Sequence, residues 1–312
     1  MYEKLVIVTR KTRLQELIER FNTRGQAKFY IDQSGGNFGE YEREDSEYRA
    51  SFEMLRKSLE FELKVQVIDR EFLPTFQFMP QDVVITLGQD GLVANAAKYV
   101  RGQPIVAVNS NPGIFDGILL PYVPASARKA VSAVLEGKAS VLEVTMAEAG
   151  LNDGQKILAF NDLFIGPRTH VSARYQISWQ GKSESQSSSG VLISTGAGST
   201  GWLSSVFNMA HGVASLTGGK TSKGIKGIRL PWQDPNLLFV VREPFVSRHS
   251  AAEIVAGMVA PHQQLTLESL MPSGGVIFSD GIETDYLNFN SGAVVRVEAA
   301  HQKARLVCEK VA

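Results

Sequence analysis

The sequence predicts two domains, an N-terminal α/β domain with a parallel sheet and a β-rich C-terminal domain. Two β-branched runs, 82–87 and 104–108, flank a segment with helical spacing, and this order is typical of a parallel βαβ unit. Further along, 170–179 alternates strictly between apolar and polar residues, as half-buried antiparallel strands do. A proline-containing break between the two patterns predicts domains of residues 1–122 and 123–312, a length that accommodates both.

The remaining elements of the first domain follow from apolar spacing. The run 5–8 predicts a buried strand, and Leu14, Leu17, Ile18 and Phe21 form one stripe of a helix. Residues 34–48 are polar and charged, which predicts an exposed loop. A second helical stripe follows at 52–59 and a second strand at 65–68.

In the second domain, short apolar runs alternate with turn residues, which predicts an antiparallel sandwich or a mixed sheet. Besides 170–179, the predicted strands are 237–241, 265–267, 276–278 and 294–297.

Composition limits the class of protein. Hydrophobic residues make up 44% of the chain and charged residues 21%, which excludes a disordered or fibrous protein. The 32 basic and 32 acidic side chains give a formal net charge of zero, so we expect neither nucleic acid nor a membrane as a partner. A single cysteine, Cys308, excludes an intrachain disulfide and a multi-cysteine zinc site.

The N-terminal apolar run is too short for a secretory signal, because Arg10 and Lys11 follow it directly. No segment approaches the roughly 18 apolar residues of a membrane span. We therefore expect a soluble, cytoplasmic protein, and a homo-oligomer.

Both strands of the predicted βαβ unit end in polar turns. Gly88-Gln89-Asp90-Gly91 follows the first strand, and 109–113 follows the second. Because ligands bind beyond the carboxyl ends of parallel strands, this edge is a predicted binding site. The start of the helix at 88–91 also offers free N–H groups and a partial positive charge, which suit a phosphate.

Asp90 has two interpretations in this turn. A carboxylate repels a phosphate, but it is suited to take a proton from a substrate hydroxyl that lies beside that phosphate. Asp90 is equally suited to cap the helix N-terminus. The local sequence leaves both open.

Asn161 and Asp162 are adjacent polar residues inside an otherwise apolar run that predicts one continuous strand, and such groups need hydrogen-bond partners when buried. A bulge or a structural hydrogen bond explains them, and so does recognition of ribose hydroxyls. The histidines show no metal-ligand spacing, so we expect no metal bound by the protein itself: they are His170, His211, His249, His262 and His301.

The segment Gly196–Gly201 spells G-x-G-x-x-G. A dinucleotide-binding Rossmann unit requires an acidic residue about 20 positions later, yet 202–233 contains neither Asp nor Glu. A P-loop requires Lys where Trp202 stands. A loop of small residues remains, which lets a ligand approach the backbone closely.

These motifs, taken in order, resemble the NAD kinase family. That family has a Gly-Gly-Asp-Gly turn, then Asn-Glu, then Thr-Gly-Ser-Thr-Ala-Tyr, and the matching segments here are 88–91, 161–162 and 197–202. The segment 159–166 looks closest to the mitochondrial-type branch. The resemblance implies an architecture shared with diacylglycerol-type lipid kinases, with the site in the cleft between an α/β and a β-rich domain.

The resemblance also implies an activity, the transfer of the ATP γ-phosphoryl to the 2′-hydroxyl of NAD to make NADP. Asp90 would be the catalytic base, and Mg²⁺ would be held mainly through the phosphates of ATP. Those phosphates would bind at Gly88, Gln89, Gly91 and Asn109. The residues implied to bind the dinucleotide are Asn161, Asp162, Ser199, Thr200, Gly201 and Ser205.

Four positions depart from the family pattern. Gln89 replaces a glycine, Asp162 replaces Glu, Ser189 stands where much of the family has Asp, and Trp202 replaces Tyr. If the turn needs a positive φ at position 89, Gln costs about 1–2 kcal/mol there. Two alternatives therefore stay open, namely a sugar or lipid kinase on the same scaffold and a catalytically impaired dinucleotide-binding regulator.

Overall fold

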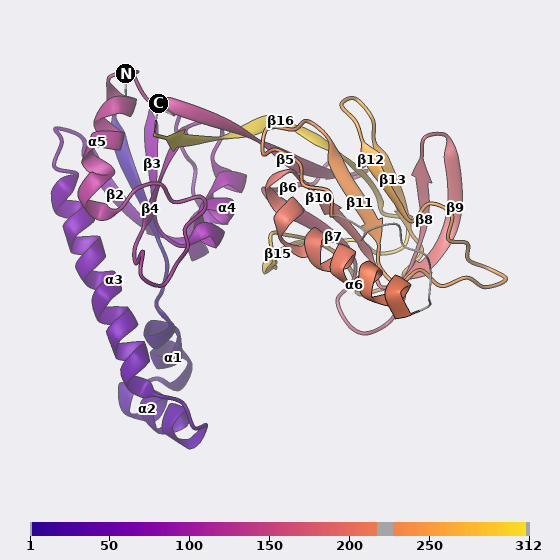
Figure 1. Ribbon diagram of the computed structural model, residues 1–312, viewed down its shortest axis with the longest axis horizontal. Helices are drawn as coiled ribbons and strands as arrows, with labels where there is room; N and C mark the ends of the chain where they lie inside the picture. The colour runs from indigo at the N-terminus through magenta and orange to yellow at the C-terminus, as the bar shows by residue number, and fades with distance from the viewer. Residues whose placement is uncertain (1, 217–226, 310–312) are drawn as a thin grey trace. The chain divides into compact units, whose positions relative to one another are not determined.

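A computed structural model of the protein describes residues 2–216 and 227–309, and these form two compact units (Figure 1). The first unit is Met1–Leu142 with Arg305–Ala312, and the second is Glu143–Ala304. The boundary therefore lies some way beyond the predicted position at 122. The boundary lies later because helix α5 (Pro124–Leu135) belongs to the first unit, where its Val131 and Val134 pack into the core.

The first unit is built on a parallel sheet with the strand order β2-β1-β3-β4, and β16 ends beside β4 in parallel register. This confirms the predicted α/β class. Strands β1, β3 and β4 are short and almost wholly buried, as their β-branched sequences require, whereas β2 lies at the edge and is mostly exposed. Their bounds are β1 Lys4–Thr9, β2 Lys64–Asp69, β3 Asp82–Gly88, β4 Pro104–Asn109 and β16 Val294–Cys308.

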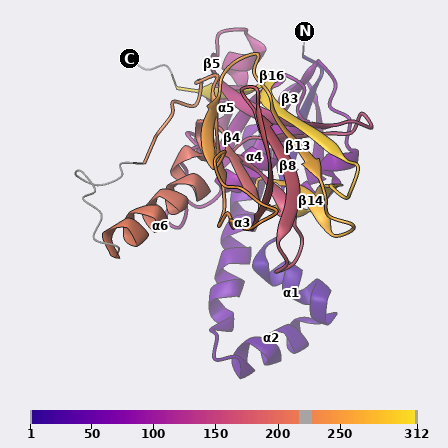
Figure 2. The same cartoon turned by 90° about the vertical axis from the view of Figure 1, so that its right-hand side faces the viewer.

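Helices cover this sheet, and Leu55 and Leu59 of the α3 segment pack with Val131 against strand residues of β1 and β3. At the far end of α3, the two short helices α1 and α2 gather around it (Figures 1 and 2). The helices are α1 Arg13–Phe21, α2 Arg24–Gln33, α3 Phe38–Ser58, the 3-10 turn η1 Arg70–Thr75 and α4 Asp90–Tyr99.

The prediction of an exposed loop at 34–48 is wrong, because most of that segment is the first half of α3. Although many of its side chains are charged, this segment also makes specific contacts with the rest of the first unit. Phe38 and Tyr48 are buried. The carboxylate of Asp45 accepts a hydrogen bond from the Thr12 hydroxyl (2.7 Å) and forms an ion pair with Arg49 (2.8 Å). These tertiary and i,i+4 contacts stabilise a helix that has no continuous apolar stripe.

The second unit contains antiparallel sheets, as predicted, with a core between them that includes Tyr175, Phe239 and Phe289. A six-stranded sheet has the order β12-β11-β10-β7-β14-β15. Its strands are β7 Asp162–Pro167, β10 Val191–Ser194, β11 Leu237–Val241, β12 Ala256–Val259, β14 Gly275–Ser279 and β15 Ile282–Asn288. The facing strands are β5 Ser140–Leu151, β6 Lys156–Ala159, β8 Ala173–Trp179, β9 Lys182–Ser188 and β13 Leu265–Ser269, with the first part of β16.

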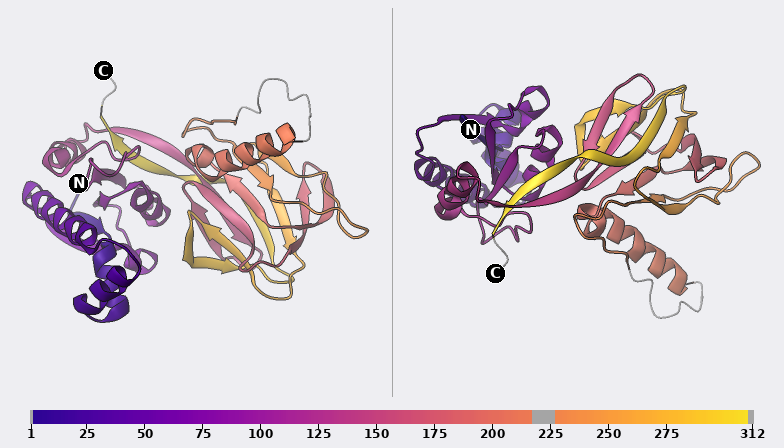
Figure 3. Two further views of the ribbon diagram at one scale, coloured as in Figure 1. Left: turned by 60° about the horizontal axis from the view of Figure 1, so that its bottom comes forward. Right: turned by 90° about the horizontal axis from the view of Figure 1, so that it is seen from above.

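One helix of the second unit, α6 (Trp202–Leu216), begins directly after the 3-10 turn η2 (Ala197–Thr200). Leu203 anchors α6 against Leu192 and Leu238 of the six-stranded sheet, and the later turns run away from it (Figures 2 and 3). None of the helices in the described ranges is both long enough and apolar enough to cross a bilayer.

Candidate functional site

The turn after β3 carries the residues that the sequence assigned to phosphate binding. Gly88 is the last residue of β3, Gln89 is the N-cap, and Asp90 is the first residue of α4. The N–H groups in the first turn of a helix lack intrahelical partners, and together with the helix dipole they attract an anion. The turn therefore presents backbone N–H groups of α4 at the carboxyl end of β3.

Gln89 fits this turn without backbone strain. Its φ of −119° and ψ of 170° are those of an extended residue. The turn needs no left-handed residue at this position, so the conditional cost of replacing glycine does not arise.

Asp90 is not the helix cap. The cap position is Gln89, whose side chain makes no capping bond, while Oδ1 of Asp90 accepts a hydrogen bond from the backbone N–H of Leu119 (2.6 Å). The other carboxylate oxygen has no hydrogen-bond partner among the described residues. One oxygen therefore fixes the carboxylate and the other is available to a ligand.

Asn109 lies beside Gly88 in the register of the parallel sheet, so the two predicted turns meet at one edge. Its Oδ1 accepts the N–H of Asn111 (2.9 Å), and its Nδ2 donates to the carbonyl of Phe115 (3.1 Å). Both ends of the amide thus shape the loop that also fixes Asp90. Gly117 allows this, because its φ is +65° and a Cβ there would lie 2.5 Å from Asn109 Nδ2.

Arg10 also lies at this edge, although the sequence analysis used it only to end an apolar run. It follows β1 directly, and a Cβ on Gly88 would lie 3.7 Å from its Cδ. Its Nη2 pairs with Glu44 of α3 (3.1 Å), and its backbone N–H donates to the hydroxyl of Tyr48 (3.1 Å). The signal in the sequence is a basic residue immediately after a buried parallel strand.

In the second unit, Asn161 and Asp162 mark the point where the chain changes sheets. The sequence predicted one continuous strand, and this is wrong, since β6 ends at Ala159 in one sheet and β7 begins at Asp162 in the other. The side chains of both residues make no hydrogen bond with any described residue. They are therefore available to a ligand.

A carboxylate that the sequence analysis missed holds this corner. Asp280, in the turn between β14 and β15, accepts hydrogen bonds from the backbone N–H groups of Phe160 (2.9 Å), Asn161 (2.6 Å) and Asp162 (3.2 Å). It occupies the left-handed region, with φ +53°. An Asp-Gly pair after a strand signals such a turn, but its distant partner cannot be read from local sequence.

The surroundings of Asp162 change the pKa of its side chain. Burial and the nearby Asp280 carboxylate raise the pKa of Asp162 to about 7. Both effects disfavour the charged form. The side chain can therefore change its protonation state near neutral pH.

The glycine-rich loop packs directly onto this corner. The hydroxyl of Thr195 donates to the carbonyl of Phe160 (2.6 Å), and the backbone N–H of Thr195 donates to the carbonyl of Asn161 (2.9 Å). A Cβ on Gly198 would lie 2.1 Å from that same carbonyl of Asn161. The glycines of this loop therefore allow two backbone segments to pack closely. The loop follows β10, which pairs antiparallel with β7 and β11, so 196–201 is not the phosphate-binding turn of a Rossmann unit.

The predicted residues of this loop differ in accessibility. Ser199 is buried, and its hydroxyl donates to the carbonyl of Gly196 (2.7 Å) and accepts from the N–H of Leu230 (3.3 Å). The others are exposed: Thr200, Gly201 and Ser205.

An aromatic surface lies on the same sheet. Phe164 stacks with Trp202 (5.6 Å between ring centroids) and with Phe278 (6.4 Å). The guanidinium of Arg242 lies 5.2 Å from the ring of Trp202. A Cβ on Gly166 would lie 2.6 Å from the ring of Phe164, so the ring rests directly on backbone. This half-exposed surface is suited to a planar group.

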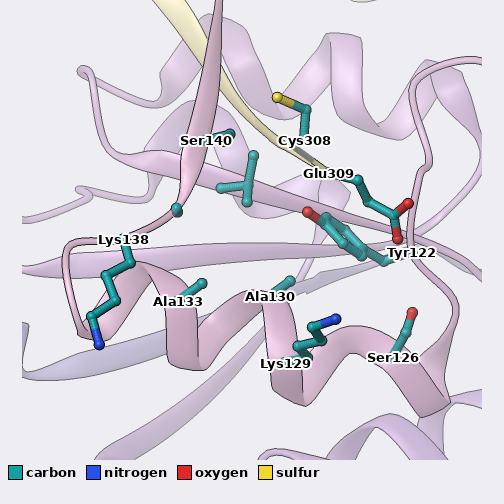
Figure 4. A pocket seen from close by; sticks show the side chains of 11 residues that line it. Tyr122, Ser126, Lys129, Ala130, Ala133, Lys138, Ser140, Cys308 and Glu309 are labelled. Carbon is teal, nitrogen blue, oxygen red and sulfur yellow. The ribbon is translucent and has the colours of Figure 1, made fainter. Parts of the chain in front are cut away.

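A pocket elsewhere in the first unit contains none of these residues. It has a volume of about 380 Å³ and lies between α5 and the end of β16 (Figure 4). Tyr122 lines it, and burial with the neighbouring Cys308 and Glu309 raises the pKa of this tyrosine to about 12. Within 2–216 and 227–309, no three His, Cys, Asp or Glu side chains gather as metal ligands.

Comparison with known proteins shows distant but consistent relatives. No family model matches the chain. A protein of Oryza sativa subsp. japonica named "Probable NADH kinase" is 24% identical over 221 residues, which cover 63% of this chain and 62% of that protein. An NAD kinase of Saccharolobus islandicus is 28% identical over 152 residues, covering 49% of this chain and 55% of that protein. The matches thus span less than two thirds of the length of these relatives.

The fold points the same way. The crystal structure of yeast NADH kinase complexed with NADH matches with a TM-score of 0.62 and 17% identity, covering 99% of this chain and 84% of that chain. Sequence and fold relate this chain to the NAD kinases.

One departure from the NAD kinase pattern now has a structural counterpart. The hydroxyl of Ser189, which stands where much of that family has Asp, hydrogen-bonds to the carboxylate of Glu243. Glu243 adopts a left-handed conformation, with φ +51°. A carboxylate thus lies beside position 189, although it comes from a different segment of the chain.

Proposed function

We propose that this protein is a kinase that transfers the γ-phosphoryl of ATP to the 2′-hydroxyl of the adenosine ribose of NAD or NADH. The observation that carries the proposal is the Asp90 carboxylate, fixed by the N–H of Leu119 at a helix N-terminus suited to phosphate. The named relatives and the shared fold support it.

In the proposed reaction, the ribose hydroxyl oxygen attacks the γ-phosphorus, the bond to the ADP oxygen breaks, and the hydroxyl proton passes to the free oxygen of Asp90. Such phosphoryl transfer depends mainly on positioning and on charge stabilisation. The first turn of α4 supplies N–H donors for the phosphates, with Gly88, Gln89 and Gly91 around them.

Mg²⁺ is expected to arrive with ATP and to neutralise charge on the phosphates. Of the residues at the turn, only Asp90 offers a carboxylate, and it has one free oxygen. This donor set fits a cation held mainly through phosphates and water rather than by a cage of side chains.

For the dinucleotide, we assign the ribose hydroxyls to the free side chains of Asn161 and Asp162. A carboxylate accepts and an amide both donates and accepts, which is what a pair of hydroxyls requires. We assign the exposed residues Thr200, Gly201 and Ser205 to the same dinucleotide site, and the surface of Phe164 and Trp202 is suited to a base or nicotinamide ring.

A homo-oligomer is the second part of the proposal. Met209, Val213 and Leu216 are exposed along one stripe of α6, and exposed apolar stripes favour association. Light scattering of the purified protein tests it: Met209→Glu with Val213→Glu should lower the molar mass of an oligomer, and a monomeric wild type would refute it.

The test of the activity is product formation from NAD and from NADH with MgATP, run beside glucose, glycerol and diacylglycerol as acceptors. We expect a product phosphorylated at the 2′-position of the adenosine ribose. Turnover of a sugar or lipid with none of NAD or NADH would assign the chain to the other kinase class. NAD binding without turnover of any acceptor would favour a regulator, although Gln89 gives no backbone reason for one.

A further inference from the structure

The strand order of the first unit reverses between β1 and β3. In open α/β sheets, ligands bind outside the carboxyl ends of the strands at such a reversal. The two segments that leave the sheet there are Arg10, directly after β1, and the turn 88–91, directly after β3. Arg10 thus occupies the topological position of a ligand-binding residue.

Arg10 is held tightly in this position and is only 9% exposed. Its Nη1 donates to the carbonyl of Lys11 (3.0 Å) and its Nη2 pairs with Glu44 (3.1 Å). The central carbon of the guanidinium lies 5.2 Å from the ring centre of Tyr48 and 5.8 Å from that of Phe115. Three segments therefore orient it, namely α3, the loop after β4 and its own turn.

One donor of this guanidinium has no partner. The Nε of Arg10 is buried and makes no hydrogen bond within the part of the chain that the structure describes. Leaving a buried donor of a charged group without an acceptor is costly, so native proteins supply one. The acceptor here is therefore expected to come from a ligand or from water.

The surroundings favour an anion as that acceptor. Glu44 is shared between Arg10 and Arg13, so this group of three charges keeps one net positive charge. The side chain of Arg10 lies beside Gly88, whose turn opens α4 with free N–H groups. Arg10 also lines a pocket of about 390 Å³ with Tyr48 and Phe52.

We propose that Arg10 binds a phosphate of the donor nucleotide, which it shares with the helix N-terminus at 88–91. The identity of the donor rests on the proposed function, whereas the anion site rests on the geometry of Arg10 and of the turn 88–91. The planar guanidinium binds phosphate through Nε and one Nη together, which a lysine cannot reproduce.

The experiment measures the affinity of MgADP and of tripolyphosphate by calorimetry. Arg10→Met, which keeps the volume and removes the charge, should weaken both by roughly 10- to 100-fold, the scale of a charged hydrogen bond. Arg10→Lys should restore only part of the affinity. The matched control is Arg24→Gln on α2, which removes an arginine that is 66% exposed and pairs with Glu42, and it should bind MgADP as the wild type does.

The outcomes separate this inference from the proposed function. Arg10-dependent binding of MgADP without NADP formation would retain the phosphate site and refute the NAD kinase assignment. Unchanged affinity in a folded Arg10→Met would overturn the inference, and Arg10→Lys serves the same purpose if the Met variant does not fold. A wild type that binds neither MgADP nor tripolyphosphate would also overturn it.

Discussion

At the scale of single residues, two carboxylates at one corner have opposite roles. The carboxylate of Asp280 accepts hydrogen bonds from the backbone N–H groups of 160–162. The side chain of Asp162 makes no such bond with a described residue, and its pKa is raised. Asp280 thus fixes the backbone between β6 and β7, and Asp162 is an acid whose charge changes near neutral pH. Each role has a measurable consequence.

The pKa of Asp162 predicts how stability depends on pH. An unfolded aspartate titrates near pH 4, while burial and Asp280 raise the folded pKa to about 7. The folded state therefore binds the proton more tightly, so this contribution to stability is complete below about pH 4 and is lost as the pH rises through about 7. Asp162→Asn removes the charge, and its melting temperature should fall less than that of the wild type between about pH 5 and pH 8.

The control for this comparison is Glu268→Gln, which removes an exposed carboxylate on β13. It should follow the wild-type curve. Parallel curves for wild type and Asp162→Asn would show that Asp162 does not titrate in this range.

Asp280 is expected to be a positioning residue. Asp280→Ala leaves three backbone N–H groups without their acceptor, which should cost about 2–4 kcal/mol of unfolding free energy in urea titrations. Because Asn161 and Asp162 are the residues that we propose to bind NAD, KM for NAD should rise more than kcat falls, and Asp280→Asn should recover part of the loss. A KM equal to that of the wild type in a folded Asp280→Ala would contradict this role.

At the scale of elements, the glycine-rich loop shows how a motif can mislead. Its spacing matches a phosphate-binding fingerprint, but Gly196 and Gly198 are needed for contact with backbone carbonyls of Pro231 and Asn161. The β-rich surroundings and the missing acidic residue were sufficient to reject the Rossmann interpretation from sequence. The contact with Asn161 was not predictable, because it joins segments far apart in the chain.

Gly198→Ala tests this packing. Its Cβ would lie 2.1 Å from the carbonyl oxygen of Asn161, so loop and corner must separate. We expect a loss of more than about 1 kcal/mol in unfolding free energy and weaker NAD binding. Gly212→Ala is the matched control, since nothing lies within 4 Å of its Cβ inside α6, and it should be neutral or stabilising. Equal stability of the two variants would contradict the packing argument.

Helix α3 shows the limit of periodicity as a predictor. Strands with β-branched runs, such as β3 and β4, were predictable because burial on both faces demands such sequences. The first half of α3 is stabilised instead by Asp45, Phe38 and Tyr48, each with a partner in another element. A pattern read along the chain does not contain those partners.

At the scale of the whole molecule, the sequence predicted the α/β and β-rich halves and the two groups of polar residues. The exact boundary was not predictable, because α5 packs back onto the first unit and β16 returns to its sheet. Asp90 and Asn109 were identified from their place at strand ends, whereas Arg10 and Asp280 required the fold. The local sequence was thus sufficient to name candidate residues at strand ends, whereas residues that join them through tertiary contacts became visible only in the structure.

The measurement that tests the account most directly is the single-turnover rate of Asp90→Asn with NAD and MgATP. The amide oxygen still accepts the N–H of Leu119, so the loop and both affinities should be retained. The amide cannot take the proton of the attacking hydroxyl, and the rate should fall by about 10²- to 10⁴-fold. A variant that binds both substrates and turns over as fast as the wild type would show that Asp90 only anchors the loop, and it would contradict the proposed mechanism.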